Sequence, residues 1–154
     1  MLSRLSEYFK QQIDLYGDEF ALSREQLRSI PDNTDPDEDA LMQDAHSVQE
    51  LYDTIHTCTE CALGTKRTRF VFGDGNPDAD IMLIGEAPGA DEDRTGHVFA
   101  GKAGELLNKI LAAIDLKREE VFIGNILKCR PPLNRDPLPE EIETCLPYLY
   151  KQIE

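Results

Sequence analysis

The sequence predicts an α/β fold built around a parallel sheet. Two short apolar runs, residues 81–84 and 121–127, are typical of buried strands, and an amphipathic helical pattern lies between them. Another helical pattern follows the second run. The order strand, helix, strand, helix favours a parallel sheet covered by helices. Two convincing strands are fewer than a stable doubly wound sheet contains, so we expect the fold of this chain to be incomplete.

The chain of 154 residues has the size of one ordinary domain. No run approaches the roughly 18 apolar residues that a membrane-spanning helix requires. The first 20 residues carry acidic and polar side chains where a signal peptide would have an uninterrupted apolar stretch. We therefore expect a cytoplasmic protein with no membrane association.

The N-terminal part is predicted to be an appendage of the domain. Apolar residues recur at steps of three and four in the first 28 residues, which predicts an amphipathic helix that docks on the domain or on a partner: Leu2, Leu5, Phe9, Ile13 and Tyr16. Residues 29–39 combine two prolines with five acids and predict a flexible acidic linker. A second helical stretch covers about 40–56. We divide the chain into an N-terminal helix and linker, 1–47, and a domain, 48–154.

The charge is strongly acidic and unevenly distributed. Of the formal net charge of −14, residues 1–50 contribute −8 and the rest −6. Basic residues gather at two places in the domain: Lys66, Arg67 and Arg69, and Lys128, Arg130 and Arg135. The local sign of charge matters more than the sum for binding a polyanion, so the acidic total does not exclude DNA.

A turn rich in glycine and proline follows the first predicted strand. Gly85, Glu86, Ala87, Pro88 and Gly89 form the motif GEAPG. Ligands favour the ends of strands in open α/β sheets, so backbone amides of this turn can face a ligand and Glu86 can reach into a cleft. A tight turn with no ligand is an equally simple interpretation of these five residues.

Two helical patterns flank the second predicted strand. The first places five apolar residues on one face of the crossover helix: Leu106, Leu107, Ile110, Leu111 and Ile114. The second begins near Pro139, a residue type that favours the first turn of a helix. One predicted helix thus precedes the second strand in the sequence, and the other follows it.

Four cysteines suggest a metal or redox site. Cys58 and Cys61 form a CxxC motif, Cys129 follows the second strand, and Cys145 lies in the last helix. Zinc, a thioredoxin-like dithiol and an iron–sulfur cluster all require converging thiols, and spacing alone does not separate zinc from a cluster. The dithiol is less favoured because this CxxC follows a helix, and four unrelated buried cysteines are the remaining alternative.

Phe99 and Asn125 are the two further candidates for ligand binding. Phe99 lies between glycines and offers a flat face on which a base can stack, although a core position is common for phenylalanine. Asn125 interrupts an apolar strand end, where a buried amide needs hydrogen-bond partners. The edge of a pyrimidine would provide them, and so would a loop that the amide tethers.

From Cys58 onward the chain resembles a known family. The CxxC motif, GEAPG, EDRTGHVFAGKAGELL, NILKCRPPLNRDP and a fourth cysteine occur in the order found in family-four uracil-DNA glycosylases, which carry a [4Fe–4S] cluster. The resemblance implies a three-layer α/β/α fold. It also implies hydrolysis of the N-glycosidic bond of uracil in DNA, in base excision repair, after the nucleotide is flipped out of the duplex.

The resemblance also assigns roles to the candidate residues. The four cluster ligands would be Cys58, Cys61, Cys129 and Cys145, with a [4Fe–4S] cluster in place of zinc. Glu86 would be catalytic and orient or activate the attacking water. Phe99 would carry the flipped uracil and Asn125 would bind its polar edge, with Gly85, Ala87, Pro88 and Gly89 completing the substrate site. The cluster's role would be structural.

The chain departs from the family pattern at its end. Family members continue beyond the last helix to a motif whose histidine stabilises the uracil anion, and His46, His56 and His97 do not match that position. We expect a truncated chain with weak or absent activity on its own, in which cluster binding survives. The alternative function is a non-catalytic iron–sulfur or zinc module that binds DNA or protein, associated with replication.

The expected partners follow from the same interpretation. Uracil-containing DNA is the expected substrate, and the chain is expected to be a monomer. A protein partner is considered only for the N-terminal extension, whose acidic residues also serve solubility.

Overall fold

The structure, a computed structural model, describes residues 20–23 and 47–154. The helix predicted in the first 28 residues and the linker predicted at 29–39 therefore lie outside the described residues, except at 20–23. None of the described helices is long and apolar enough to cross a bilayer. The described helices are α3 (Val48–Ile55), α4 (Ala90–Thr95), α5 (Lys102–Ala113) and α6 (Pro139–Ile153), with short 3-10 turns η2 (Arg118–Glu120) and η3 (Pro132–Asn134).

Four strands form one sheet in the order β1-β3-β4-β2. The central pair, β3 (Ile81–Gly85) and β4 (Phe122–Asn125), is parallel, which confirms the predicted α/β core. The edge strands β1 (Phe20–Ser23) and β2 (Asp74–Gly75) run antiparallel to their neighbours and were not predicted. Residues 20–23 thus form a strand paired with β3, where the sequence pattern had placed them in a helix.

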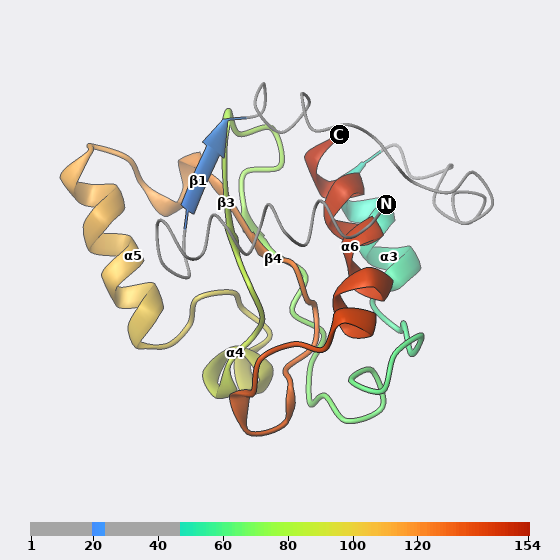
Figure 1. Cartoon of the computed structure of the whole chain (residues 1–154). Helices are drawn as coiled ribbons and strands as arrows, with labels where there is room; N and C mark the ends of the chain where they lie inside the picture. The colour runs from blue at the N-terminus through green and yellow to red at the C-terminus, as the bar shows by residue number, and fades with distance from the viewer. Residues whose placement is uncertain (1–19, 24–46) are drawn as a thin grey trace.

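Side chains of the central strands alternate between two apolar clusters. On one face, Met82, Ile84 and Phe122 pack with residues of α3 and α6. On the other face, Ile123 packs with Leu107 and Leu111 of α5. Because successive strand residues point to opposite faces, the sheet has helices on both sides. Figure 1 shows α5 on one side of the sheet and α3 and α6 on the other, so the predicted three-layer arrangement is confirmed.

The crossover helix was predicted correctly, but only part of its apolar face is buried. Leu107 and Leu111 are 6% and 3% exposed, whereas Leu106, Ile110 and Ile114 are 56%, 48% and 61% exposed. The apolar residues span a wider arc of the α5 surface than the sheet covers. Of the five residues placed on one helical face by the sequence pattern, only Leu107 and Leu111 are buried.

The register of the central pair brings two predicted site residues together. Gly85 lies opposite Asn125 at the ends of β3 and β4. The pairing continues into the loops, because Ile126 N donates to Gly85 O at 2.9 Å and Leu127 N donates to Glu86 O at 3.0 Å. The GEAPG turn and the segment that leads to Cys129 therefore leave the sheet side by side, above α4 in Figure 1.

Candidate active site

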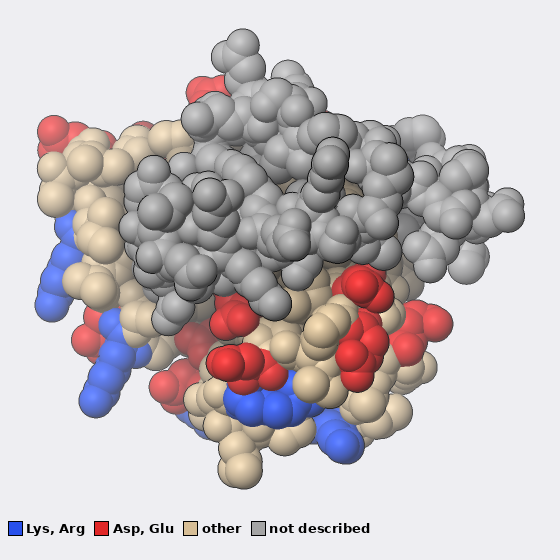
Figure 2. Space-filling view, in the orientation of Figure 1, with Lys and Arg blue, Asp and Glu red and all other residues tan. Residues whose placement is uncertain are grey.

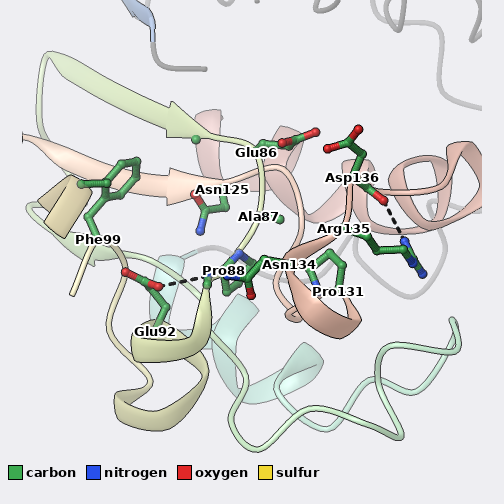
Figure 3. A pocket seen from close by; sticks show the side chains of 13 residues that line it. Glu86, Ala87, Pro88, Glu92, Phe99, Asn125, Pro131, Asn134, Arg135 and Asp136 are labelled. Carbon is green, nitrogen blue, oxygen red and sulfur yellow. Dashed lines mark hydrogen bonds between the residues drawn. The ribbon is translucent and has the colours of Figure 1, made fainter. Parts of the chain in front are cut away.

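A pocket of about 310 Å³ lies at the carboxyl ends of β3 and β4. It is lined by all seven residues predicted to bind or act on a substrate: Gly85, Glu86, Ala87, Pro88, Gly89, Phe99 and Asn125. Figure 3 shows Phe99 on one side of the Asn125 amide and the turn at Ala87 and Pro88 on the other. A pocket of this volume has the size of small-ligand sites. The structure thus gathers residues that are up to 40 positions apart in the chain.

Gly85 permits the close approach of the two ligand-binding candidates. A Cβ atom at this position would overlap Oδ1 of Asn125 and would lie 2.8 Å from Cζ of Phe99. Any side chain at residue 85 would therefore displace the amide or the ring. The first glycine of GEAPG is required by this packing rather than by a positive φ angle.

Phe99 is held in a backbone conformation that phenylalanine rarely adopts. Its φ angle is 48°, in the left-handed region. Hydrogen bonds fix the residue before it, because Val98 N donates to Asp74 Oδ2 at 3.0 Å and Arg118 donates to Val98 O. Gly104 packs against the Phe99 carbonyl and has no room for a side chain. The surrounding contacts thus maintain a strained residue, as is common at binding sites.

Glu92 is a pocket residue that sequence reasoning missed. Its Oε2 accepts a hydrogen bond from Gly89 N at 3.0 Å, and its Oε1 accepts from Ala100 N at 2.8 Å and from Gly101 N at 3.0 Å. One carboxylate therefore joins the GEAPG turn to the loop of Phe99 (Figure 3). Its place at the third position of α4 is a capping-box position, which is the signal that would have indicated it.

The loop after β4 forms the other wall of the pocket and was also missed as a lining element. Pro131, Asn134, Arg135 and Asp136 line the pocket. Arg130 Nε donates to Asn134 Oδ1 at 2.6 Å, which closes the loop on itself. The run PPLNRDP was identified only as part of a family motif. The available signal was a pair of prolines followed by polar residues, shortly after a strand that ends at the predicted site.

Arg135 anchors this wall to α6. Its two terminal nitrogens donate to the carboxylate of Glu141 at 2.9 and 2.6 Å. The hydrogen bond from Arg135 holds the pKa of Glu141 below its ordinary value, although burial of this carboxyl acts in the opposite direction. The positive charge of Arg135 is thus paired with the carboxylate of Glu141. Figure 2 shows acidic and basic side chains interspersed on the face that it displays.

The four cysteines lie near one another. Cys129 and Cys145 are buried in a cluster with Leu63 and Leu127, and Cys61 packs against it. Cys58 accepts a hydrogen bond from Tyr148 OH at 3.1 Å. The thiols are close enough for Cys61 and Cys58 to influence the pKa of Cys129 electrostatically. All four are free thiols, so no disulfide competes for them.

Hydrogen-bond donors surround these sulfur atoms. Arg67 Nη1 lies 3.3 Å from the sulfur of Cys129, and Lys128 N lies 3.3 Å from that of Cys145. Burial raises the pKa of Cys145 to about 12 and also raises the pKa of Cys129. Buried thiols such as these lose their protons when they bind a metal. Four soft donors with N–H groups directed at them fit an iron–sulfur cluster.

The thiols do not meet at a single point. Among residues 47–154, no group of three or more His, Cys, Asp or Glu side chains is arranged to hold one metal ion. A [4Fe–4S] cluster needs the thiolates around a shared space, since each thiolate binds a different iron atom.

Comparisons with known proteins agree with the motifs. A family model described as "Uracil DNA glycosylase superfamily" matches residues 72–154. Three similar proteins are each named "Type-4 uracil-DNA glycosylase". The chain is 51% identical to the one from Archaeoglobus fulgidus, over 70% of this chain and 54% of that protein. It is 47% identical to the one from Pyrobaculum aerophilum, over 69% and 54%. It is 47% identical to the one from Sulfurisphaera tokodaii, over 70% and 50%.

These relatives are longer than the present chain. The chain spans about half the length of the curated relatives it matches. The matched residues 72–154 contain the whole pocket and two of the four cysteines, Cys129 and Cys145.

Proposed function

Because the chain belongs to the uracil-DNA glycosylase superfamily, we propose that it hydrolyses the N-glycosidic bond of uracil in DNA. The observation that carries this proposal is the pocket, in which Phe99 and Asn125 meet at Gly85 and Glu86 lies on the same wall. The proposed substrate is DNA that contains uracil, and the proposed state of the protein is a cytoplasmic monomer.

The pocket is suited to a base that has left the duplex. Uracil would lie against the ring of Phe99, and stacking on an aromatic ring contributes roughly 1–3 kcal/mol per base. The amide of Asn125, which is 2% exposed, would pair with the donor and acceptor groups on the polar edge of uracil. These contacts would offset the few kcal/mol that unstacking requires.

Glu86 is the proposed catalytic residue. Its carboxylate would orient a water molecule, accept a proton from it and direct its oxygen to C1′ of the deoxyribose. The bond between C1′ and N1 breaks, and uracil leaves with the bonding electrons and is protonated later. The negative carboxylate also stabilises the positive charge that develops on the sugar, while hydrogen bonds from the Asn125 amide stabilise the negative charge on uracil.

The proposed cluster ligands are Cys58, Cys61, Cys129 and Cys145. Support comes from their proximity, their free thiols and the donors from Arg67, Tyr148 and Lys128 around them. A bound [4Fe–4S] cluster would connect the CxxC segment, near the start of the domain, with Cys129 and with α6 at its end. The chemistry on uracil needs no electron transfer, so the proposed role of the cluster is structural.

A non-catalytic iron–sulfur or zinc module is not favoured. Such a module needs the cysteines but gives no reason for a strained Phe99 beside a buried amide and a carboxylate. The similar proteins named above carry glycosylase names.

The test combines the cofactor with the reaction. The protein is purified without oxygen, its iron, sulfide and visible spectrum are measured, and uracil release is followed with enzyme in excess over a single-uracil oligonucleotide. We expect about four irons per chain, slow but measurable release, and loss of that release in Glu86→Gln. A matched oligonucleotide with thymine controls for non-specific cleavage. Release that persists in Glu86→Gln, or none from wild type after prolonged incubation, contradicts the proposal; a zinc-loaded, colourless protein contradicts the cluster.

A further inference from the structure

The residue before Phe99 is held by two charged side chains that do not line the proposed uracil pocket. Asp74 belongs to β2 and Arg118 to η2. Val98 N donates to Asp74 Oδ2 at 3.0 Å, and Arg118 Nη2 donates to Val98 O. Val98 itself is fully buried, so its two backbone groups depend on partners within the protein. We call Asp74 and Arg118 the Val98 clamp.

The two side chains of the Val98 clamp are also held relative to each other. Arg118 Nη2 lies 3.8 Å from Asp74 Oδ2, and the side chains are only 25% and 28% exposed. The other arm of the guanidinium, Nη1, donates to Asn108 Oδ1 of α5 at 3.4 Å. His97 Nδ1 lies 3.2 Å from the second oxygen of Asp74. Because the guanidinium is planar, these contacts on two of its nitrogens fix its direction toward the backbone.

The Val98 clamp controls the strained backbone angle of Phe99. The oxygen that Arg118 holds belongs to the peptide group before Phe99, so its direction sets the φ angle of 48°. The peptide group after Phe99 is held by Glu92, whose Oε1 accepts from Ala100 N at 2.8 Å. Charged side chains therefore fix both peptide groups that flank the ring. Strained residues persist when the surrounding structure determines them in this way.

The same clamp connects Phe99 to the strand that carries Asn125. Asp74 pairs with Ile123 of β4, two residues before Asn125. Gly75 has a φ angle of 112°, and a Cβ atom there would overlap the backbone of the segment that leads into β4. Glycine thus permits the close approach of β2 to β4. The positions of the Phe99 ring and the Asn125 amide are consequently set from one strand.

We propose that Asp74 and Arg118 are positioning residues for uracil excision, which keep the Phe99 ring at the place where a base stacks. This inference rests on the proposed function of the pocket. Phe99 also lines a second hollow of about 440 Å³, which Asp74 and Arg118 border. Space on this side gives Phe99 room to move when the clamp is lost. A misplacement of about 1 Å can slow an enzymatic reaction by roughly hundredfold.

Arg118→Met is the informative variant, because methionine retains an apolar stem and removes the donors to Val98 O. We expect single-turnover release of uracil at saturating enzyme to slow by roughly tenfold or more, with DNA affinity little changed. Arg118→Lys keeps a positive charge and a donor and should recover part of the rate. Lys117→Met removes the same charge from the exposed neighbour and is the control. Weaker DNA binding in both methionine variants, with unchanged rates at saturation, would overturn the positioning role.

A double-mutant cycle with Phe99→Leu tests whether the clamp acts through the ring. Leucine has no aromatic face, so this change alone should slow release. In the Phe99→Leu background, Arg118→Met should have little further effect on the rate. Effects that multiply would show that Arg118 acts by another route and would overturn the proposal. Asp74→Asn keeps an acceptor for Val98 N but removes the charge near Arg118, and it serves in the same cycle if Arg118→Met does not fold.

A further readout needs neither DNA nor catalysis. In isotope-labelled protein, a strong nuclear Overhauser effect between the amide and α protons of Phe99 reports a positive φ. We expect this effect in wild type and a weaker one in Arg118→Met. If the effect weakens in the variant but wild type releases no uracil, the hold on Phe99 is supported and the proposed excision is contradicted. If wild type releases uracil and Arg118→Met keeps both the effect and the rate, the clamp is overturned while the excision stands.

Discussion

The ammonium of Lys128 lies 2.6 Å from the backbone oxygen of Asn125 and 2.5 Å from Oε1 of Gln152. This lysine is fully buried, and burial lowers its pKa to about 8, while the neighbouring Cys145 and Cys129 act in the opposite direction. Lys128 therefore lies between the thiols of Cys129 and Cys145 and the end of β4 that carries Asn125. The proposed cluster site and the proposed uracil site share this side chain as a structural link.

Replacing Lys128 by Met should destabilise the fold. The apolar side chain fills a similar space but leaves the Asn125 oxygen and Gln152 Oε1 without a donor, at roughly 1–3 kcal/mol for each buried group. The free energy of unfolding in urea measures the effect. Lys109→Met, an exposed change on α5, should leave it within about 0.5 kcal/mol. Equal stabilities for the two variants would show that the buried hydrogen bonds contribute little.

Gly85→Ala should impair uracil release more than it impairs folding. The added methyl overlaps Oδ1 of Asn125 and the Phe99 ring, so both must move. We expect a loss of stability of about 1–3 kcal/mol and a decrease in the single-turnover rate of roughly hundredfold. Gly124→Ala is the matched control on the adjacent strand, because its methyl would meet Met82 Cε at 3.4 Å, an ordinary contact. Rates that are the same in both variants would contradict the packing described at Gly85.

Glu92→Gln should show whether Glu92 positions the two pocket loops or affects DNA affinity through its charge. The amide nitrogen cannot accept a hydrogen bond, so at least one of the links to Gly89 or to Ala100 and Gly101 is lost. We expect the rate of uracil release at saturating enzyme to fall by about tenfold or more, with DNA affinity little changed. Glu105→Gln, on the exposed side of α5, removes the same charge and should have no effect on the rate. A change in affinity with an unchanged rate would contradict the positioning role.

Acid should weaken the contact between Arg135 and Glu141. The pKa of Glu141 is lowered in the folded state, so its stabilising contribution is present above the unfolded value of about 4.3 and is lost as pH falls through the lower folded value. Wild type should therefore lose stability relative to Glu141→Gln between about pH 5 and pH 3. Urea unfolding of both proteins at the two pH values measures this. A constant difference between them would show that the ion pair contributes no pH dependence.

The sequence predicted the centre of the fold better than its edges. The run at 81–84 is continuously apolar because both faces of β3 pack against apolar clusters, Met82 and Ile84 being buried and Ile81 and Leu83 partly buried, so its pattern is clear. β2 contains only Asp74 and Gly75, which carry no strand signal, and β1 pairs with a distant strand that local periodicity cannot reveal. The pattern on α5 was clear as well, but it could not show which of its apolar residues the sheet covers.

The candidate site was predicted where motifs were distinctive. GEAPG and Asn125 were identified from residue type and position at strand ends, Phe99 was identified from its place between glycines, and all line the pocket. Glu92 and Arg135 were missed because their partners are backbone amides and a carboxylate brought near only by folding. The strain at Phe99 and Leu133 has no sequence signal, since neither residue type predicts a positive φ.

The central claim is that the amide of Asn125 binds uracil in this pocket. The most direct measurement is single-turnover release of uracil by wild type and by Asn125→Asp, which keeps the shape of the side chain but replaces its hydrogen-bond donor by an acceptor. Circular dichroism and iron content establish that both proteins are folded and equally loaded. We predict release that is slower by roughly hundredfold or more in the variant. A folded Asn125→Asp protein that releases uracil at the wild-type rate would contradict the account.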